Sequence, residues 1–332
     1  GLTKKGKEII GLDPTEIQAK IYEAKSLPRF QPITIESSLD WEHVSRVMTN
    51  VLNLPGFEVI PYPKRLYVFQ GLAAHLFGYL GEISKNTLLH YRDQGFTLYR
   101  QGDFIGQFGL ERKWEPLLHG NDGAQQTVVD AAGRIIDEHF LNWELVSEDP
   151  QPGNNIELSI DLDLQKAILR TFPSGKAGAV VAVDPRSGKI LALQSFPTFD
   201  PNIFSLGISV PDWTFLRTAN DHPLEDKALR GQYPPGSVYK MIVAIAALEE
   251  GIITTGNRFF CTGSLKYGRR SFGCWKEKGH GSVNVEDAII QSCDVFFYRL
   301  GDQLGVDKIT KYAKLFGLGT PTGIGINNEK SG

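Results

Sequence analysis

A serine and a lysine three residues apart carry the strongest chemical signal in this sequence. Ser237 and Lys240 follow the rigid turn Tyr233–Gly236 and precede the apolar run Met241–Leu248, which predicts a buried helix ending at Gly251. In the first turn of such a helix, free backbone N–H groups and the helix dipole favour negative charge developing on the Ser237 hydroxyl. Lys240 lies on the same helix face. Because burial favours the neutral amine, Lys240 could take the proton of Ser237 and create a nucleophile.

A second hydroxyl stands 55 residues further on, in the segment Ser292–Asp294. This segment follows a predicted helix that begins near Asn284 and precedes another helix. A hydroxyl and a carboxylate separated by one residue at a helix junction can both face one cleft, where Ser292 could relay a proton between Lys240 and a leaving nitrogen. A plainer interpretation stays open, in which Ser237 and either Ser292 or Asp294 only cap helices and Lys240 lies at the surface.

The three cysteines of the chain fall close together and share their region with a histidine. The spacing is Cys261-x12-Cys274-x5-His280-x12-Cys293, and three thiolates with one imidazole form a ligand set for a closed tetrahedral zinc site. The intervening loop is rich in glycine and poor in apolar residues, so a metal could fold it. A Cys261–Cys274 disulfide with Cys293 free, or three unrelated buried thiols, are the alternatives. Only zinc uses His280 and accounts for an odd cysteine. We therefore predict one structural zinc.

The overall composition excludes several classes of protein. The 332 residues include 35 basic and 38 acidic side chains, a net charge of -3, which removes the electrostatic argument for nucleic-acid binding. Hydrophobic residues make up 41% and charged residues 22%, an ordinary globular mixture. Apolar runs are too short to span a bilayer, and the polar start at Gly1 has no signal peptide, so we expect an interior cut in a longer chain.

The polar, turn-rich segment 147–155 predicts a boundary between two domains, 1–150 and 151–332. We expect mixed α and β structure before it and a β-hairpin followed by helices after it. The expected elements are helices from Pro14 and over Trp41–Leu52, a strand over Tyr62–Phe69, extended segments within Gly102–Gly133, a strand over Ile156–Ile160, a helix after Asp161 and a hairpin over Ala177–Leu193.

Together these features resemble the penicillin-binding proteins, whose acyl-serine chemistry uses S-x-x-K, S-x-N and K-T-G motifs. The resemblance is closest to the class B, elongation-specific type, penicillin-binding protein 2, in which the second motif commonly reads S-x-D. Further segments that carry the likeness are Arg65–Tyr67, Ala73–Gly81, Gly109–Glu111, Leu118–Gly123 and Gly133-Arg134 in the first part of the chain, and Asp161–Gln165, Val183–Gly188 and Phe199–Asn202 in the second.

The resemblance implies an α+β protein with an elongated mixed α/β pedestal before a transpeptidase domain, which has an antiparallel sheet flanked by helices. It also implies a periplasmic D,D-transpeptidase that cross-links peptidoglycan stem peptides during cell elongation and is inhibited by β-lactams. Ser237 would attack the D-Ala–D-Ala bond, Lys240 would be the base and Ser292 the proton relay. Asp294 stands where other classes usually have Asn. The backbone N–H of Ser237 would be one oxyanion donor.

The resemblance also implies partners and a location. The pedestal would bind a SEDS-family glycosyltransferase and other elongation-complex proteins, and a single-pass anchor in the inner membrane would precede it. Some relatives carry zinc at the cysteine cluster, with carboxylates replacing one or two thiolates. Within the pedestal we expect His75, which lies between apolar residues, to be structural.

Two parts of the family pattern are expected to lie outside this sequence. The membrane anchor is one. The third motif is the other, because Lys330–Gly332 reads K-S-G but lies only 38 residues beyond Ser292. Two other functions share some of these features. A β-lactamase or β-lactam sensor uses the same S-x-x-K chemistry but leaves about 150 residues of pedestal unexplained. A pure scaffold that activates a glycosyltransferase would not need Ser237 and Lys240.

Overall fold

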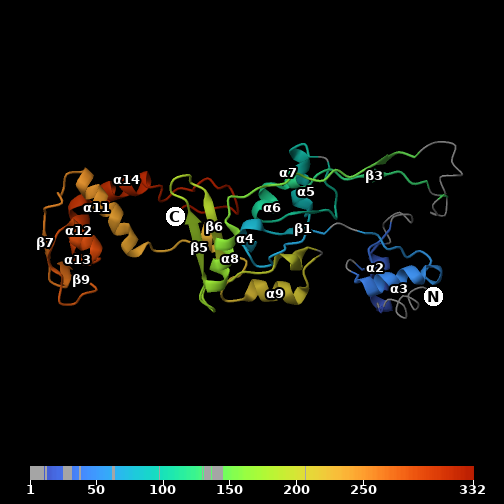
Figure 1. Ribbon diagram of the computed structural model, residues 1–332, viewed down its shortest axis with the longest axis horizontal. Helices are drawn as coiled ribbons and strands as arrows, with labels where there is room; N and C mark the ends of the chain where they lie inside the picture. Colours follow the sequence, from blue (N-terminus) through green and yellow to red (C-terminus); the bar gives the residue numbers. More distant parts are fainter. Residues whose placement is uncertain are drawn as a thin grey trace. The chain divides into compact units, whose positions relative to one another are not determined.

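The computed structural model describes residues 11, 13–24, 32–36, 39–61, 64–96, 98–128, 130, 136, 145–205 and 207–332. It divides into two compact units, Gly1–Leu224 and Glu225–Gly332. Figure 1 colours the first unit from blue to yellow and the second in orange and red. In the described ranges no helix is both long and apolar enough to cross a membrane.

Two capped helices open the first unit, as the sequence predicts. α2 (Pro14–Glu23) begins after Asp13 and α3 (Trp41–Thr49) after Asp40, and each aspartate accepts a hydrogen bond from a backbone N–H of the first turn. A 3-10 turn, η2 (Val51–Asn53), follows α3. Such N-caps satisfy donors that the helix itself leaves without partners.

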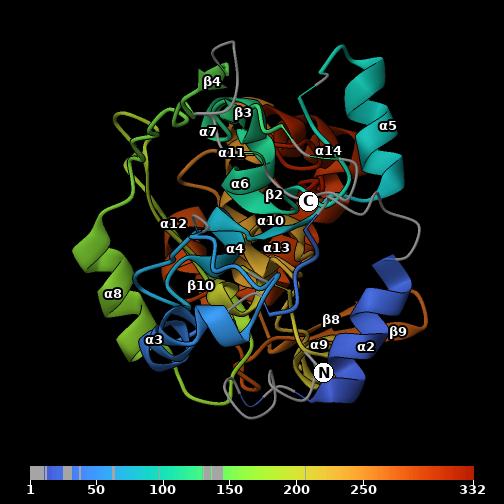
Figure 2. The same cartoon turned by 90° about the vertical axis from the view of Figure 1, so that its right-hand side faces the viewer.

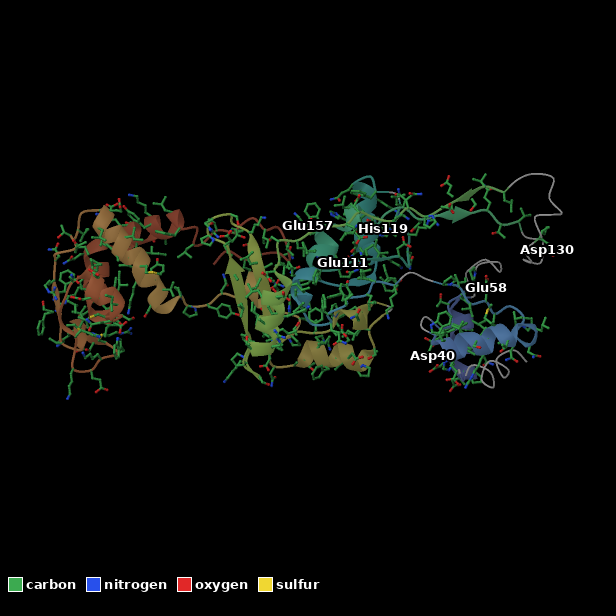
Figure 3. The ribbon with its side chains drawn as sticks, in the orientation of Figure 1. Asp40, Glu58, Glu111, His119, Asp130 and Glu157 are labelled. Carbon is green, nitrogen blue, oxygen red and sulfur yellow. The ribbon has the colours of Figure 1, made fainter. Side chains whose placement is uncertain are left out.

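The middle of the first unit consists of short elements around two buried carboxylates. Its elements are α4 (Ala74–Phe77), β1 (Leu80–Glu82), α5 (Lys85–Asp93), β2 (Phe104–Gly106), α6 (Gly109–Lys113), α7 (Glu115–Leu118), β3 (Ala124–Gln125) and β4 (Ser147–Glu148), with β1–β2 and β3–β4 paired antiparallel. Glu111 on α6 and Glu115 on α7 are 7% and 2% exposed. Figure 3 labels Glu111 and, just after α7, His119.

Two strand predictions in this unit are wrong. Within Tyr62–Phe69, the described residues form no strand, because the backbone of Tyr67 bonds to the side chain of Asn202 instead of to a neighbouring strand. Ile156–Ile160 likewise forms no strand. The segment Gly102–Gly133 contains the helices α6 and α7 besides extended chain, and Gly133-Arg134 lies outside the described residues. His75 is structural as predicted, since it is 1% exposed and its Nε2 lies 2.7 Å from the Pro223 carbonyl oxygen.

The predicted hairpin and the helix before it are confirmed. β5 (Gly178–Val183) and β6 (Ile190–Phe196) pair antiparallel, and α8 (Leu162–Thr171) begins after Asp161, which caps it. α8 packs against β6 through the buried Gln165, whose amide bonds to the backbone of Leu193. η4 (Pro201–Phe204) and α9 (Val210–Thr218) complete the unit.

The second unit is a helical cluster with two small sheets. Its elements are α10 (Lys227–Arg230), η5 (Gly236–Val238), α11 (Tyr239–Glu249), β7 (Phe259–Cys261), β8 (Ser264–Tyr267), β9 (Arg270–Gly273), β10 (Gly281–Val283), α12 (Val285–Ile290), α13 (Asp294–Leu304) and α14 (Val306–Leu315). β7 pairs with β10, and β8 pairs with β9 in a hairpin that Figure 2 labels. Side chains of α11, α12 and α13 share one core with the three cysteines.

The apolar helix predicted after Ser237 is buried on one side only in this structure. Val243, Ala244, Ala246 and Ala247 of α11 are buried, whereas Met241, Ile245 and Leu248 are 49%, 38% and 37% exposed. The helix ends as predicted: Glu250 is the C-cap and Gly251 follows with a φ of 66°, in the left-handed region that glycine adopts without strain. The division into compact units falls after Leu224. The predicted domain boundary near residue 150 stays a prediction.

Candidate active site

Ser237 lies in the 3-10 turn η5, which ends at Val238, directly before α11 begins at Tyr239. The sequence predicts Ser237 within the first α-helical turn, whereas in the structure it lies in the 3-10 turn that precedes the α-helix, next to Gly236 with its φ of 57°. The Ser237 side chain belongs to an exposed residue. Its hydroxyl is therefore accessible to a ligand while its backbone N–H remains at the start of a helix.

The structure brings the four predicted catalytic side chains into one network. The hydroxyl oxygens of Ser292 and Ser237 are 2.9 Å apart. Lys240 Nζ donates to Ser292 Oγ and to the Ser292 carbonyl oxygen, both at 3.0 Å, and to Asp294 Oδ1 at 2.6 Å. The exposed fraction of the Lys240 side chain is 15%. A continuous path for a proton thus joins the lysine to the exposed serine.

Ser292 owes its position to an unusual backbone conformation. Its φ is 51°, which is uncommon for a residue other than glycine. α12 ends at Ile290 and α13 begins at Asp294, so this strained residue lies in the short link between two helices. Strained conformations of this kind concentrate at functional sites. Nothing in the sequence indicates it.

An ion pair dominates the electrostatics of the network. Burial opposes the charge of Asp294, but the hydrogen bonds from Lys240 and from the backbone N–H of Trp275 outweigh it and lower the pKa of this carboxyl below its ordinary value. The sequence leads us to expect that burial keeps the Lys240 amine neutral, and this stays a prediction. In the structure the amine lies 2.6 Å from a carboxylate oxygen of Asp294.

Sequence reasoning missed Trp275. Its backbone N–H donates to Asp294 Oδ2 at 3.1 Å, and its indole Nε1–H donates to the Gln291 carbonyl oxygen at 2.9 Å. The residue directly follows Cys274, which is the only sequence signal near it. An exposed tryptophan in a loop has no periodic pattern that would reveal its neighbours.

The four predicted zinc ligands also converge. One donor atom from each of Cys261, Cys274, His280 and Cys293 lies within 4.8 Å of all the others. His280 Nδ1 is 3.7 Å from the Cys261 Sγ and 3.5 Å from the Cys274 Sγ. The three cysteines are 1%, 7% and 0% exposed. Strand β7 supplies the first ligand, and the N-cap of α13 supplies the last.

All three cysteines are free thiols in the structure. Burial raises the pKa of the Cys293 thiol to about 12. The His280 Nε2 atom is buried and has no hydrogen-bond partner, so Nδ1 is the ring nitrogen that faces the thiols. Cys274 follows β9 and His280 precedes β10, so the donors come from four separate points along the chain.

Comparison with known families assigns both parts of the chain. A family model for the penicillin-binding protein dimerisation domain matches residues 2–158, and one for the penicillin binding protein transpeptidase domain matches residues 178–332. The chain therefore belongs to the class B penicillin-binding proteins, with the α+β architecture of a pedestal followed by a transpeptidase domain. Within that family it is similar to penicillin-binding protein 2.

Individual relatives agree with this assignment. The peptidoglycan D,D-transpeptidase MrdA of Escherichia coli K12 is 35% identical over 98% of this chain and 51% of its own length. PBP2 of Helicobacter pylori, in its complex with MreC, superposes with a TM-score of 0.84 at 27% identity, covering 99% of this chain and 60% of that one. A chain of a peptidoglycan synthase complex that coordinates polymerization and crosslinking has a TM-score of 0.69 at 26% identity, over 95% and 56%. The chain spans about half the length of the curated relatives it matches.

The third-motif candidate does not behave as a motif strand. Lys330–Gly332 forms no strand in the structure, and the Lys330 N–H donates to the Leu229 carbonyl oxygen. This agrees with reading the segment as part of the stretch that follows the second motif.

Proposed function

We propose that the protein is a serine-type peptidoglycan D,D-transpeptidase of cell elongation, inhibited by β-lactams. The observation that carries this proposal is the line of contacts from Lys240 through Ser292 to the exposed hydroxyl of Ser237. The E. coli relative is likewise named a peptidoglycan D,D-transpeptidase. A pure scaffold would not require an exposed serine at the end of such a network.

In the acylation step, the Ser237 oxygen attacks the carbonyl carbon between the two D-Ala residues of a stem peptide. The ester bond to Ser237 forms and the amide C–N bond breaks, while the Ser237 proton passes through Lys240 and Ser292 to the leaving amine of the terminal D-Ala. In this step Lys240 acts as a neutral amine that takes the Ser237 proton and becomes neutral again when Ser292 passes the proton to the leaving nitrogen. The contact with Asp294 Oδ1 holds the amine in position.

In the second step, the amine of a neighbouring stem peptide attacks the ester. A new amide bond forms, the ester bond breaks, and the amine proton returns through the same network to the Ser237 oxygen. The Ser237 N–H at the start of α11 is one donor for the oxyanion of both tetrahedral intermediates.

Labelling with a fluorescent penicillin tests this proposal in the intact protein. We expect a covalent adduct on the peptide that contains Ser237, and its loss in Ser237→Ala. Ser271→Ala, which removes an exposed hydroxyl on β9, is the matched control and should label normally. An adduct on another residue, or no adduct with wild-type protein, would refute the proposal.

We also propose that Cys261, Cys274, His280 and Cys293 hold one structural zinc ion. Tetrahedral zinc with ordinary bond lengths separates a sulfur from a nitrogen ligand by about 3.6 Å, and the two measured Sγ–Nδ1 separations are 3.7 and 3.5 Å. The buried thiols and the inward-facing Nδ1 fit the donor set. Bound zinc would link the loop 261–280 to Cys293, which lies between Ser292 and Asp294, and would thereby fix the orientation of this segment.

Metal analysis of protein purified without chelator tests the zinc site. We expect about one zinc per chain, absent in Cys293→Ala and retained in His90→Ala, a substitution on α5 far along the sequence from the cluster. A metal-free protein with a mass two hydrogens short would favour the Cys261–Cys274 disulfide. A metal-free protein with full mass would favour unrelated thiols.

For the pedestal we propose binding of a SEDS-family polymerase and other elongation-complex proteins, in the periplasm, beside a membrane anchor elsewhere in the protein. Trp41, Met48 and Leu52 lie along one side of α3 and its following turn and are 87%, 60% and 95% exposed. Large apolar side chains presented together favour a protein contact. The H. pylori relative is known in complex with MreC.

Co-purification with the polymerase tests this surface. Trp41→Ala combined with Leu52→Ala should weaken association at least tenfold, as expected for aromatic and aliphatic anchors of an interface. Glu42→Ala, an exposed charge on the same helix, serves as the control. Unchanged association of the double variant would remove α3 from the interface.

A further inference from the structure

Trp275 is held firmly and yet remains open to solvent. Hydrogen bonds fix it at both ends, from its backbone N–H to Asp294 and from its indole N–H to the Gln291 carbonyl oxygen. Its ring meets the His280 ring edge to face, with centroids 5.3 Å apart. Nevertheless 66% of the residue is exposed. A tryptophan that only completed the loop would bury its ring, since burial supplies most of the stabilisation that this side chain can give.

A short chain of contacts joins Trp275 to the reacting hydroxyl. Asp294 accepts from Trp275 through one carboxylate oxygen and from Lys240 through the other, at 3.1 and 2.6 Å. Lys240 is 3.0 Å from Ser292 Oγ, which is 2.9 Å from Ser237 Oγ. The backbone of Trp275 is therefore tied to the candidate active site, and the indole is fixed beside it by its bond to the Gln291 carbonyl oxygen. Other exposed aromatic residues of the loop, such as Tyr267 on β8, have no such link.

We propose that Trp275 is a specificity-determining residue whose indole forms one wall of the subsite for the acyl part of the donor. This inference rests on the proposed transpeptidase function. Peptide planes and aliphatic side chains stack on an indole face with little loss of entropy when the ring is already fixed.

The acyl part is the portion of the donor on which such a wall can act throughout the reaction. The leaving D-Ala departs after acylation, whereas the acyl part stays bound through both half-reactions. A wall that touches it can contribute to each step.

The test measures second-order acylation rates of the intact protein with two penicillins that differ only in the acyl side chain. Benzylpenicillin carries a phenylacetyl group, and 6-acetamidopenicillanic acid carries an acetyl group on the same amide nitrogen. For Trp275→Ala we expect an about fivefold loss with benzylpenicillin, as for one aromatic contact, and a loss below twofold with 6-acetamidopenicillanic acid. Trp275→Phe keeps a ring and should recover part of the difference.

Tyr267→Ala is the matched control, because it removes an exposed aromatic side chain from the same loop without touching the network. Its ratio of the two rates should equal that of the wild type. If Trp275→Ala left the ratio of the two acylation rates at its wild-type value, the inference would be overturned. A wild-type protein that is not acylated at all would instead refute the transpeptidase proposal.

Discussion

Two carboxylate networks, one in each unit, contain similar hydrogen-bond partners but serve different purposes. In the first unit Glu111 pairs with Arg65 at 2.8 Å and accepts from the Tyr67 hydroxyl at 3.1 Å. Burial raises the pKa of Glu111, and the charge of Arg65 partly opposes that effect. In the second unit Asp294 pairs with Lys240 at 2.6 Å and its pKa is lowered.

The difference lies in where each network ends. Glu115, beside Glu111, is 2% exposed and accepts from the Gly106 N–H at 2.6 Å, while His119 Nδ1 lies 2.8 Å away. Every group there meets another fixed protein group. The Asp294 network ends on the hydroxyl of Ser237, at an exposed residue. A satisfied buried network stabilises a fold, whereas one that ends at an accessible hydroxyl can pass a proton to a ligand.

Removal of the lysine should have the largest effect. We expect Lys240→Ala to slow acylation by about 10²- to 10⁴-fold, because the network then has no base, with little change in thermal stability. Stopped-flow acylation with penicillin and a thermal melt measure the two quantities. Lys266→Ala on the exposed β8 strand is the control. Acylation at the wild-type rate would mean that another group serves as the base.

Removal of the buried glutamate should have the opposite pattern. Glu115→Ala leaves the Gly106 N–H and the Tyr99 hydroxyl without their acceptor, so we expect a loss of about 2–3 kcal/mol in the free energy of unfolding. The acylation rate of the folded molecules should stay the same. Denaturant titration measures the loss, with Glu82→Ala, an exposed carboxylate on β1, as the comparison. A slower acylation by folded protein would show that the two networks are coupled.

Replacing the Asp294 carboxylate by an amide of nearly the same size should slow acylation less than removing the lysine does. Asp294→Asn keeps an oxygen to accept from the Trp275 N–H but exchanges a charge-assisted bond to Lys240 for a neutral one. We expect acylation to slow by about tenfold. If the variant matched the loss seen in Lys240→Ala, the carboxylate itself would take part in the proton transfer.

The smallest expected effect is on the pH dependence of stability, through the His119–Glu115 pair in the first unit. The hydrogen bond to Glu115 raises the pKa of His119 above its ordinary value of 6.5, although burial opposes the shift. The stabilising contribution of this pair is therefore complete below about pH 6.5 and is lost as pH rises through the raised pKa of the folded state. Denaturant midpoints between pH 5 and 9 should fall across this window for wild-type protein, and this fall should be absent in His119→Gln.

Local signals in the sequence determined much of this protein. The caps Asp161 and Asn284 predict the helices that follow them, since a side-chain acceptor at this position satisfies the donors of the first turn. Gly251 predicts the end of α11 because glycine adopts a positive φ freely. Residue types and spacing also predict the chemistry. Ser237 and Lys240 indicate a nucleophile with its base, and the three cysteines with His280 indicate a metal site.

Tertiary structure alone decided how those groups meet. The strand expected over Tyr62–Phe69 is absent from its described part because Asn202, 135 residues from Tyr67, binds its backbone. The left-handed φ of Ser292 turns its hydroxyl toward Ser237 and has no sequence signature. Likewise the ion pair of Asp294 with Lys240 joins residues 54 positions apart. Periodicity and caps act over a few residues, whereas contacts between distant residues form only when the packed elements bring them together.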